Sequence, residues 1–432
     1  MASDYSAQDM ARPGECVDLY YYDGDTSKKQ CFPTTQNTKY SVEFSNKSGG
    51  TSVFTIPPNN GIQDVVCELV LPAFAGAQAD LEDLGIPRAW GYALVDSVSF
   101  RYAGTSQYFL TGDQVFQLAL RAQPSLSAAD AVATLGGNAA SGLDLSGVKQ
   151  RANIVLTLPH NWPSGVGKSH PFPTDLLTQQ VQVTLQLKNP KAIVSVAAGA
   201  GAGAITALNN ALANGLDSAK FVVQQVMLNN QGDALARRTD MATNVYAFPA
   251  EFIQNAVRIP LPSQGISAQV SLTGFRAGEV KALLCWVTNT ADVAGSVGTA
   301  GYTNNPFIWY LPDSVTMTYA GDIYAQYENA SSPLWNLINN NKQPAINNVE
   351  IDGTGAAIAF NDVLSQYFIL PFAQTHVDED SHYTLVHGRP VTNGIVNLNI
   401  TMPEASANWV LNVSYLYNTT ILMSQGTADF VF

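Results

Sequence analysis

The sequence has 432 residues, of which 46% are hydrophobic and only 13% are charged. This composition excludes intrinsic disorder, which needs low hydrophobicity and high charge, and the length predicts two or three domains. The 21 basic and 34 acidic side chains give a net charge of −13, so the chain is a poor candidate for binding the phosphate backbone of a nucleic acid. So small a charged fraction indicates that much of the surface is covered, for example by copies of the same chain.

At the start of the chain, residues 1–12 are polar, so we expect no export signal. A chain that is not exported meets a reducing compartment, and we therefore expect free thiols at all four cysteines, Cys16, Cys31, Cys67 and Cys285. The spacing leaves a disulfide between Cys16 and Cys31 open. Five Asn-x-Ser/Thr sequons are expected from the richness in Asn and Thr, and whether any carries a glycan is left open; they lie at Asn46, Asn329, Asn399, Asn412 and Asn418.

The chain repeats itself at an offset of 217 residues. Residues 94–104 read LVDSVSFRYAG and residues 311–321 read LPDSVTMTYAG, which are identical at seven of eleven positions. Further matches at this offset, or one residue from it, join His170 with His387, residues 181–185 with 398–402, and Cys67 with Cys285. A tandem duplication explains these matches. We predict an N-terminal arm (1–39), a first domain (40–195), a linker with short helices (196–254) and a second domain (255–432).

The repeated segments have the pattern of strands. In residues 97–102 and 314–319 apolar side chains alternate with polar ones, which predicts one buried and one exposed face. Other segments that predict strands are 154–158, 181–187, 368–372, 398–402 and 409–417. Gly and Pro, 33 and 22 residues, lie mostly between such runs. Many short strands with turns between them favour an all-β antiparallel sandwich or barrel over a parallel α/β sheet.

Helices and long loops are predicted locally. Residues 205–228 carry apolar side chains among Ala and Asn, which favours one or two short helices between the domains. The AAGAGAGA tract before them, 197–204, is typical of a linker or surface loop. Residues 118–148 and 288–306 are rich in small residues and predict long loops, which usually make functional contacts.

No sequence motif indicates catalysis or nucleotide binding. Residues 165–169, GVGKS, lack the preceding glycine of a phosphate-binding loop and are followed by two prolines instead of a helix. The glycines of 199–203 lack the spacing of a dinucleotide-binding turn. The chain contains no GxSxG, HExxH or HxH. We therefore expect no enzyme and no cofactor.

One acidic and histidine-rich stretch has ligand chemistry. His376, Asp378, Asp380 and His382 lie within seven residues and could bind a divalent cation. The first repeat has no such cluster, which favours a solvated loop between two strands. We therefore hold these four residues as weak metal candidates only.

The predicted tandem domains, acidic and without catalytic motifs, resemble the double jelly-roll major capsid proteins of icosahedral double-stranded DNA viruses, which include large eukaryotic viruses, virophages and polinton-like relatives. Residues 94–116 are similar to the family's early strand pair, and residues 153–187 to the stretch that closes its first jelly roll. In the second copy, residues 383–402 and 412–432 resemble the late strands and the closing strand pair. The resemblance implies two tandem eight-stranded antiparallel jelly rolls with a few short helices in loops.

The resemblance also implies a function. In such capsids three chains form a pseudo-hexameric capsomer, because two similar domains per chain give six similar corners, and capsomers tile the shell of the virion. The expected partners are other copies of the chain, then minor capsid and penton proteins, with an internal lipid membrane as a further contact of the N-terminal arm. The loops at 118–148 and 288–306 become candidate turrets or clamps between subunits, and no nucleic-acid binding is expected.

Two other classes of jelly-roll protein are alternatives to the capsid hypothesis. A two-domain cupin-type enzyme is also a tandem jelly roll, but it needs an HxH metal motif that this chain lacks. A glycan-binding or glycan-cleaving jelly-roll protein stays open, since 6 Trp and 18 Tyr could supply an aromatic sugar platform. Self-assembly distinguishes the capsid hypothesis from both.

Overall fold

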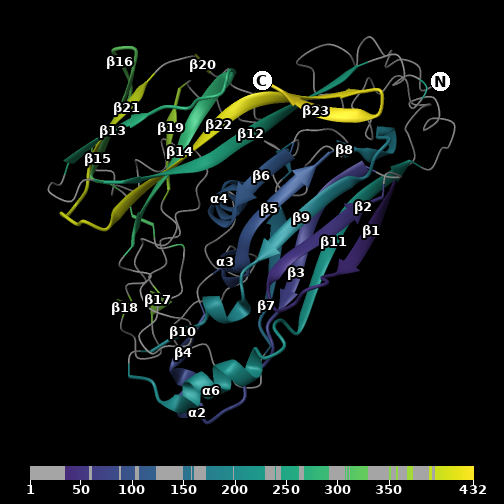
Figure 1. Cartoon of the computed structure of the whole chain (residues 1–432), viewed down its shortest axis with the longest axis vertical. Helices are drawn as coiled ribbons and strands as arrows, with labels where there is room; N and C mark the ends of the chain where they lie inside the picture. Colours follow the sequence, from purple (N-terminus) through teal and green to yellow (C-terminus); the bar gives the residue numbers. More distant parts are fainter. Residues whose placement is uncertain are drawn as a thin grey trace.

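The chain forms two β-rich units, the first at lower right in Figure 1 and the second at upper left. The computed structural model describes residues 35–57, 61–86, 89–102, 107–122, 149–156, 158–159, 172–197, 199–228, 239, 245–261, 267–290, 307, 309–310, 312–328, 350–351, 357–358, 367–372, 389–391 and 395–432.

The first unit is built from antiparallel strands: β1 (Thr35–Glu43), β2 (Gly50–Ile56), β3 (Gly61–Val70), β5 (Val95–Arg101), β6 (Gln107–Thr111), β7 (Arg151–Leu156), β8 (Phe172–Pro173), β9 (Val181–Leu187) and β11 (Ser218–Leu228). They form a five-stranded sheet with the order β1-β11-β3-β7, to which β8 is added, and a four-stranded sheet with the order β2-β9-β5-β6. The short strand β8 pairs with the start of β3.

The second unit repeats this arrangement with β12 (Tyr246–Pro260), β13 (Ser267–Leu272), β14 (Glu279–Asn289), β15 (Ser314–Tyr319), β16 (Asp322–Glu328), β19 (Phe368–Pro371), β20 (Arg389–Pro390), β21 (Val396–Thr401), β22 (Trp409–Ser424) and β23 (Thr427–Val431). Its two main sheets have the orders β12-β22-β14-β19 and β13-β21-β15-β16. In both units the first three long strands alternate between the sheets, and the later strands pair back in the order of an eight-stranded jelly roll. The predicted fold class is confirmed.

The pairing within the sheets confirms the internal repeat. Cys67 of β3 lies opposite Phe221 of β11, just as Cys285 of β14 lies opposite Val413 of β22. Pro173 in β8 and Pro390 in β20 pair with equivalent ends of β3 and β14.

One matched segment needs a correction. Phe100 of β5 lies opposite Val183, and its equivalent Met317 of β15 lies opposite Leu398. Val183 of β9 therefore corresponds to Leu398 of β21, which is an offset of 215 residues. The sequence match of residues 181–185 with 398–402 suggested 217. An even difference keeps every side chain on its face, which is why the sequence pattern did not reveal it.

The strand faces follow the predicted alternation, except that Ser99, on the polar face of β5, is also buried. Val98 and Phe100 in β5, and Val315 and Met317 in β15, are fully buried between the sheets of their units. Tyr319 is only partly buried. The buried apolar side chains of both units belong to one continuous cluster, so the two cores are joined.

The remaining elements are short. The helices are α2 (Gln78–Glu82), α3 (Trp90–Leu94), α4 (Gly112–Ala122) and α6 (Ala202–Ala211), with 3-10 turns at Thr174–Leu176 and Pro190–Ile193. The two-residue strands β4 (Leu84–Gly85) and β10 (Ser195–Val196) pair with each other, as do β17 (Glu350–Ile351) and β18 (Ala357–Ile358). In the described part of the chain no helix is long and apolar enough to cross a membrane.

Several segments differ from the sequence prediction. Residues 218–228, expected to be helical within a linker, are the central strand β11, because Gly215 with φ +78° ends the preceding helical turn. Residues 246–254 of the expected linker belong to β12, and residues 35–39 of the expected arm belong to β1. Residues 118–122 of the first expected loop continue helix α4, and 288–289 of the second expected loop end β14.

Candidate functional site

The weak metal candidates His376, Asp378, Asp380 and His382 all lie outside the described residues. Within the ranges that the structure describes, no group of three or more His, Cys, Asp or Glu side chains could hold a metal ion. Most of the two expected long loops and residues 1–34 also lie outside these ranges. The candidate functional site is instead the interface between the two jelly rolls.

Helix α4 of the first unit is hydrogen-bonded to the β12-β22 pair of the second. The Gln114 side chain donates from Nε2 to Ser414 Oγ at 2.9 Å and to the carbonyl oxygen of Gln254 at 3.2 Å. Its Oε1 accepts from the backbone N–H of Thr111 at 2.9 Å. Gln114 and Ser414 are fully buried, so these bonds satisfy groups that would otherwise be costly to remove from water.

Aromatic side chains fill the interface next to these bonds. The rings of Tyr108 and Phe252 lie 5.5 Å apart, and Phe430 of β23 lies 5.5 Å from Phe252 and 6.1 Å from Tyr108. The guanidinium of Arg276 stands 5.0 Å from the centroid of the Phe252 ring. Edge-to-face packing of this kind stabilises a contact beyond the burial of area alone.

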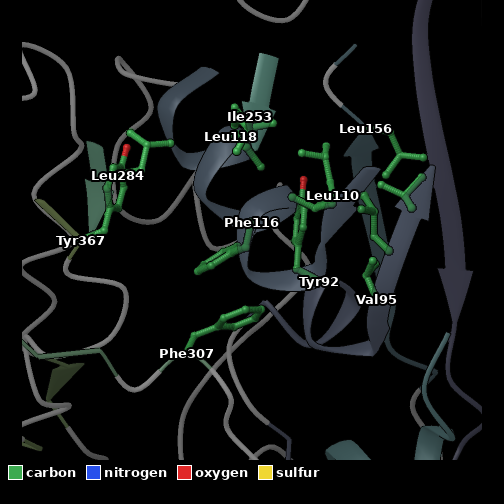
Figure 2. Close-up of a cluster of buried hydrophobic side chains, with 14 of the residues drawn as sticks. Tyr92, Val95, Leu110, Phe116, Leu118, Leu156, Ile253, Leu284, Phe307 and Tyr367 are labelled. Atoms are coloured by element: carbon green, nitrogen blue, oxygen red, sulfur yellow. The ribbon is translucent and has the colours of Figure 1, made fainter. Parts of the chain in front are cut away.

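A second aromatic group joins α4 to the second unit. Phe116 stacks on Phe307 with ring centroids 4.1 Å apart, and Trp309 meets the Phe116 ring edge-on at 5.7 Å. Figure 2 shows Phe116 pointing from α4 toward Phe307, within the same cluster as Tyr92 and Tyr367. The side chains of Phe116, Phe307 and Trp309 are at most 2% exposed.

The C-terminal hairpin closes the interface at its upper edge, where β22 and β23 reach over the first unit in Figure 1. The carbonyl oxygen of Gly426 accepts from the N–H of Thr178 at 2.9 Å and from its hydroxyl at 3.1 Å. Gln425 and Gly426 both have positive φ, +50° and +81°, as a tight hairpin turn requires. Any side chain at position 426 would collide with Thr178, so this position needs glycine.

Ionisable side chains lie in and beside the interface. Burial raises the pKa of Asp113, at the start of α4, to about 6, while the nearby charges of Lys188 and Arg258 act in the opposite direction. Lys281 of β14 and Glu251 of β12 form a buried ion pair. Burial, and after it the charge of Glu251, raises the pKa of Tyr108 from its ordinary value.

Sequence reasoning did not find this site, because its partners are far apart in the chain. Gln114 and Ser414 are 300 residues apart, and Tyr108 and Phe252 come from different repeats. A local signal is the presence of two polar residues, Gln114 and Gln117, among the buried side chains of α4, and it becomes interpretable once the topology is known.

The outer face of the β2-β9-β5-β6 sheet carries exposed apolar side chains. Val53, Thr184, Ser99 and Phe109 lie opposite one another in a row across the four strands. The ends of this row, Val53 and Phe109, are 54% and 36% exposed. On the second unit, Ile323 and Ile395 are 61% and 54% exposed.

The structure bears on the expected free thiols and on the glycosylation sequons. Cys67 and Cys285 are free and fully buried, whereas Cys16 and Cys31 lie outside the described residues. Asn412 is buried and donates to the carbonyl oxygen of Trp286 at 3.4 Å, so its sequon is closed to a glycan in the folded chain. Asn46 and Asn399 are exposed, and Asn329 lies outside the described residues.

No protein-family model matches the sequence, and no curated protein matches it. The fold, however, is similar to solved structures. PBCV-1 VP54, fitted into a reconstruction of the virophage Sputnik, matches with a TM-score of 0.57 and 16% identity over 92% of this chain and 97% of the other. A chain of the PBCV-1 virus capsid matches with a TM-score of 0.57 and 15% identity over 92% and 97%.

The Faustovirus major capsid protein matches with a TM-score of 0.50 and 10% identity over 91% of each chain. These likenesses extend over both units, and the strand orders on either side of the interface are those of one jelly roll used twice. The fold of this chain is therefore the double jelly roll found in viral major capsid proteins.

Proposed function

We propose that this chain is the major capsid protein of an icosahedral double-stranded DNA virus and that three copies form a pseudo-hexameric capsomer. The observation that supports this most strongly is the pair of equivalent eight-stranded units in one chain. Three chains related by threefold symmetry would present six similar units, which fits a hexagonal position in a shell. The likeness to capsid proteins over about nine-tenths of the chain supports the same proposal.

The interface between the units suits this role. A capsomer can tile a shell only if the two units of each chain keep a fixed relation, and a buried hydrogen-bond and aromatic interface provides that rigidity. The proposed protein is a structural component that needs no catalytic site and no cofactor.

Lateral contacts need surfaces that can be buried in the assembly. The exposed Val53 and Phe109 lie on the β2-β9-β5-β6 sheet, Ile323 lies in β16 and Ile395 directly precedes β21, and only 13% of the chain is charged. Interface cores are depleted of charge in the same way. We assign these faces to contacts between copies, first within the trimer and then between capsomers.

The remaining assignments follow from the same role. The protein would be located in the virion shell and would contact minor capsid and penton proteins. Residues 1–34 would extend beneath the shell as an arm toward those proteins or an internal membrane.

Light scattering after gel filtration tests the proposal directly. A trimer has a mass of about 139 kDa, three times the 46.2 kDa of the chain, and should show hexagonal outlines in negative stain. Val53→Asp with Phe109→Asp should weaken the trimer or its lateral contacts, while the exposed change Ser41→Asp, on β1 of the other sheet of the first unit, serves as the control.

Removing residues 1–34 should leave trimers intact but block assembly of shells. A clean monomer would contradict the capsid proposal, and glycan arrays and glycosidase assays would then test the alternative of a glycan-binding or glycan-cleaving protein.

A further inference from the structure

The ion pair of Lys281 and Glu251 crosses a strand. Lys281 lies on β14 and Glu251 on β12, and β22 runs between these two strands. Glu251 lies directly opposite Asn418 of β22, so these two side chains share one face of the sheet. Neighbouring strands are about 4.8 Å apart, and a lysine that reaches from β14 to a carboxylate on β12 must therefore pass over β22 at the level of Asn418.

Glu251 and Lys281 are almost inaccessible to water, and Asn418 is half-buried. Glu251 is 3% and Lys281 is 8% exposed, and the Oδ1 atom of Asn418 is itself buried. Tyr108 of the first unit lies close enough to feel the charge of Glu251. Burying either of these two charged groups without the other would be costly.

The first unit shows which part of this arrangement belongs to the fold alone. Lys281 is the extra residue of a β-bulge between β14 and β22. Gln63 occupies the same bulge between β3 and β11. The residue of β11 that corresponds to Asn418 is Val226, which lies opposite Asn37 and Gly61. The bulge is thus common to both jelly rolls, whereas the amine, the carboxylate and the amide occur together only in the second.

We infer that Lys281, Glu251 and Asn418 form an autocatalytic cross-linking site that joins β14 to β22 by an isopeptide bond. Glu251 accepts a proton from the Lys281 ammonium group, and the neutral Nζ then attacks Cγ of Asn418. The Nζ–Cγ bond forms, the Cγ–Nδ2 bond breaks, and Nδ2 leaves as ammonia with one proton that comes from Nζ by way of Glu251. Glu251 keeps a second proton from Nζ and ends as a neutral carboxyl, so no unpaired charge stays buried and no oxidant or other reactant is needed.

The physical basis is orientation and activation. A lysine becomes a nucleophile when its environment lowers the cost of the neutral amine and a base takes its proton. Fixing the amine beside the amide on adjacent strands replaces a bimolecular encounter by an intramolecular one. Glu251 is the group that moves the proton in both halves of the reaction. Because all three residues belong to one chain, this inference is independent of the capsid proposal.

Mass spectrometry of the purified full-length chain tests the inference. The intact mass should be lower than the sequence mass by one ammonia molecule. Proteolysis should yield one branched peptide that contains both Lys281 and Asn418. Glu251→Gln and Lys281→Arg keep the side-chain volume but remove the base and the nucleophile, so both variants should have the full mass and no branched peptide.

The matched control is Lys39→Arg, which alters an exposed lysine that pairs with Glu68. This variant should still lose the ammonia. Without the bond that closes a loop of more than one hundred residues, the melting temperature of Lys281→Arg should fall by roughly 5–10 °C.

A wild-type chain of full mass without the branched peptide would overturn the inference, and the three residues would then be an unreacted ion pair and its neighbour. Ammonia loss that persists in Lys281→Arg would also overturn it, because the loss would then arise elsewhere. If the variants fail to fold, the intact mass and the peptide map of the wild-type chain still show whether the isopeptide bond is present.

Discussion

The sheets β1-β11-β3-β7 and β12-β22-β14-β19 share strand order and bulge position, yet their outer faces meet different surroundings. On the first sheet Lys39 and Glu68 form an ion pair at 3.7 Å with side chains 63% and 43% exposed. On the second sheet Lys281 and Glu251 are almost inaccessible to water, and Tyr108 of the first unit lies near Glu251.

The two units thus share strand order and bulge position, but the side chains on the outer faces of their equivalent sheets differ in burial and in chemistry. An exposed ion pair contributes little because water and salt screen it, whereas a buried pair cannot lose one partner without leaving a charge in a dry site. The second unit therefore needs both partners of its ion pair, while the first keeps a solvated outer face.

The largest effect should come from the interior that both units share. Val98→Asp and the equivalent Val315→Asp each bury an unpaired carboxylate and should cost several kcal/mol, enough to prevent folding. Soluble yield and gel filtration measure the outcome. Val53→Asp, at a half-exposed strand position, should stay folded. Native-size protein from either interior variant would show that the assigned strand faces are wrong.

The next effect should come from separating the units. Phe116→Ala removes the ring that stacks on Phe307 and should lower the free energy of unfolding by about 3–5 kcal/mol. Denaturant titration measures this change. The control is Phe109→Ala, an exposed ring of the neighbouring strand, which should change the monomer by less than about 1 kcal/mol. Equal losses in the two variants would contradict the role of the interface.

The two ion pairs can be compared directly. Lys281→Ala leaves Glu251 buried without the cation of the ion pair and should cost about 3 kcal/mol or more. Lys39→Ala should cost at most about 1 kcal/mol. Thermal unfolding at low and high salt measures both, and only the Lys39 effect should depend on salt. Similar losses of stability in Lys281→Ala and Lys39→Ala would contradict the difference between the buried and the exposed ion pair.

The smallest effect concerns pH. The folded-state pKa of Asp113, about 6, lies above the ordinary value of 3.8, so the fold favours the protonated carboxyl. Its contribution to stability is therefore present below pH 3.8 and is lost as the pH rises through 6. Asp113→Asn should stabilise the chain by about 1–3 kcal/mol above pH 7, with the gain fading toward pH 4. An equal gain at both pH values would contradict this assignment.

The repeat in the sequence predicted much of the fold. The alternation in residues 97–102 and 314–319 placed two equivalent strands and their buried faces correctly. The prediction was wrong for residues 218–228, which follow a real helix, α6, without a long loop. The turn at Asn214-Gly215 separates helix from strand there, and composition averaged over both segments concealed it.

The interface could not be predicted in the same way. Its contacts join residues that only the jelly-roll topology brings together, such as Gln114 with Ser414 and Phe116 with Phe307. Each of these residues taken singly looks like an ordinary position of a helix, a strand or a loop. A local pattern reports which face a side chain occupies, but not what the second unit places against that face.

The buried cysteines give the two jelly rolls separate reporters. Cys67 and Cys285 occupy equivalent central positions, and burial raises the pKa of both thiols, so neither reacts while its own unit stays closed. A pulse of alkylating reagent followed by peptide mapping would time the opening of each unit within the same molecule. Simultaneous labelling of the two cysteines would mean that the two units unfold cooperatively. Labelling of one cysteine before the other would show which unit unfolds first.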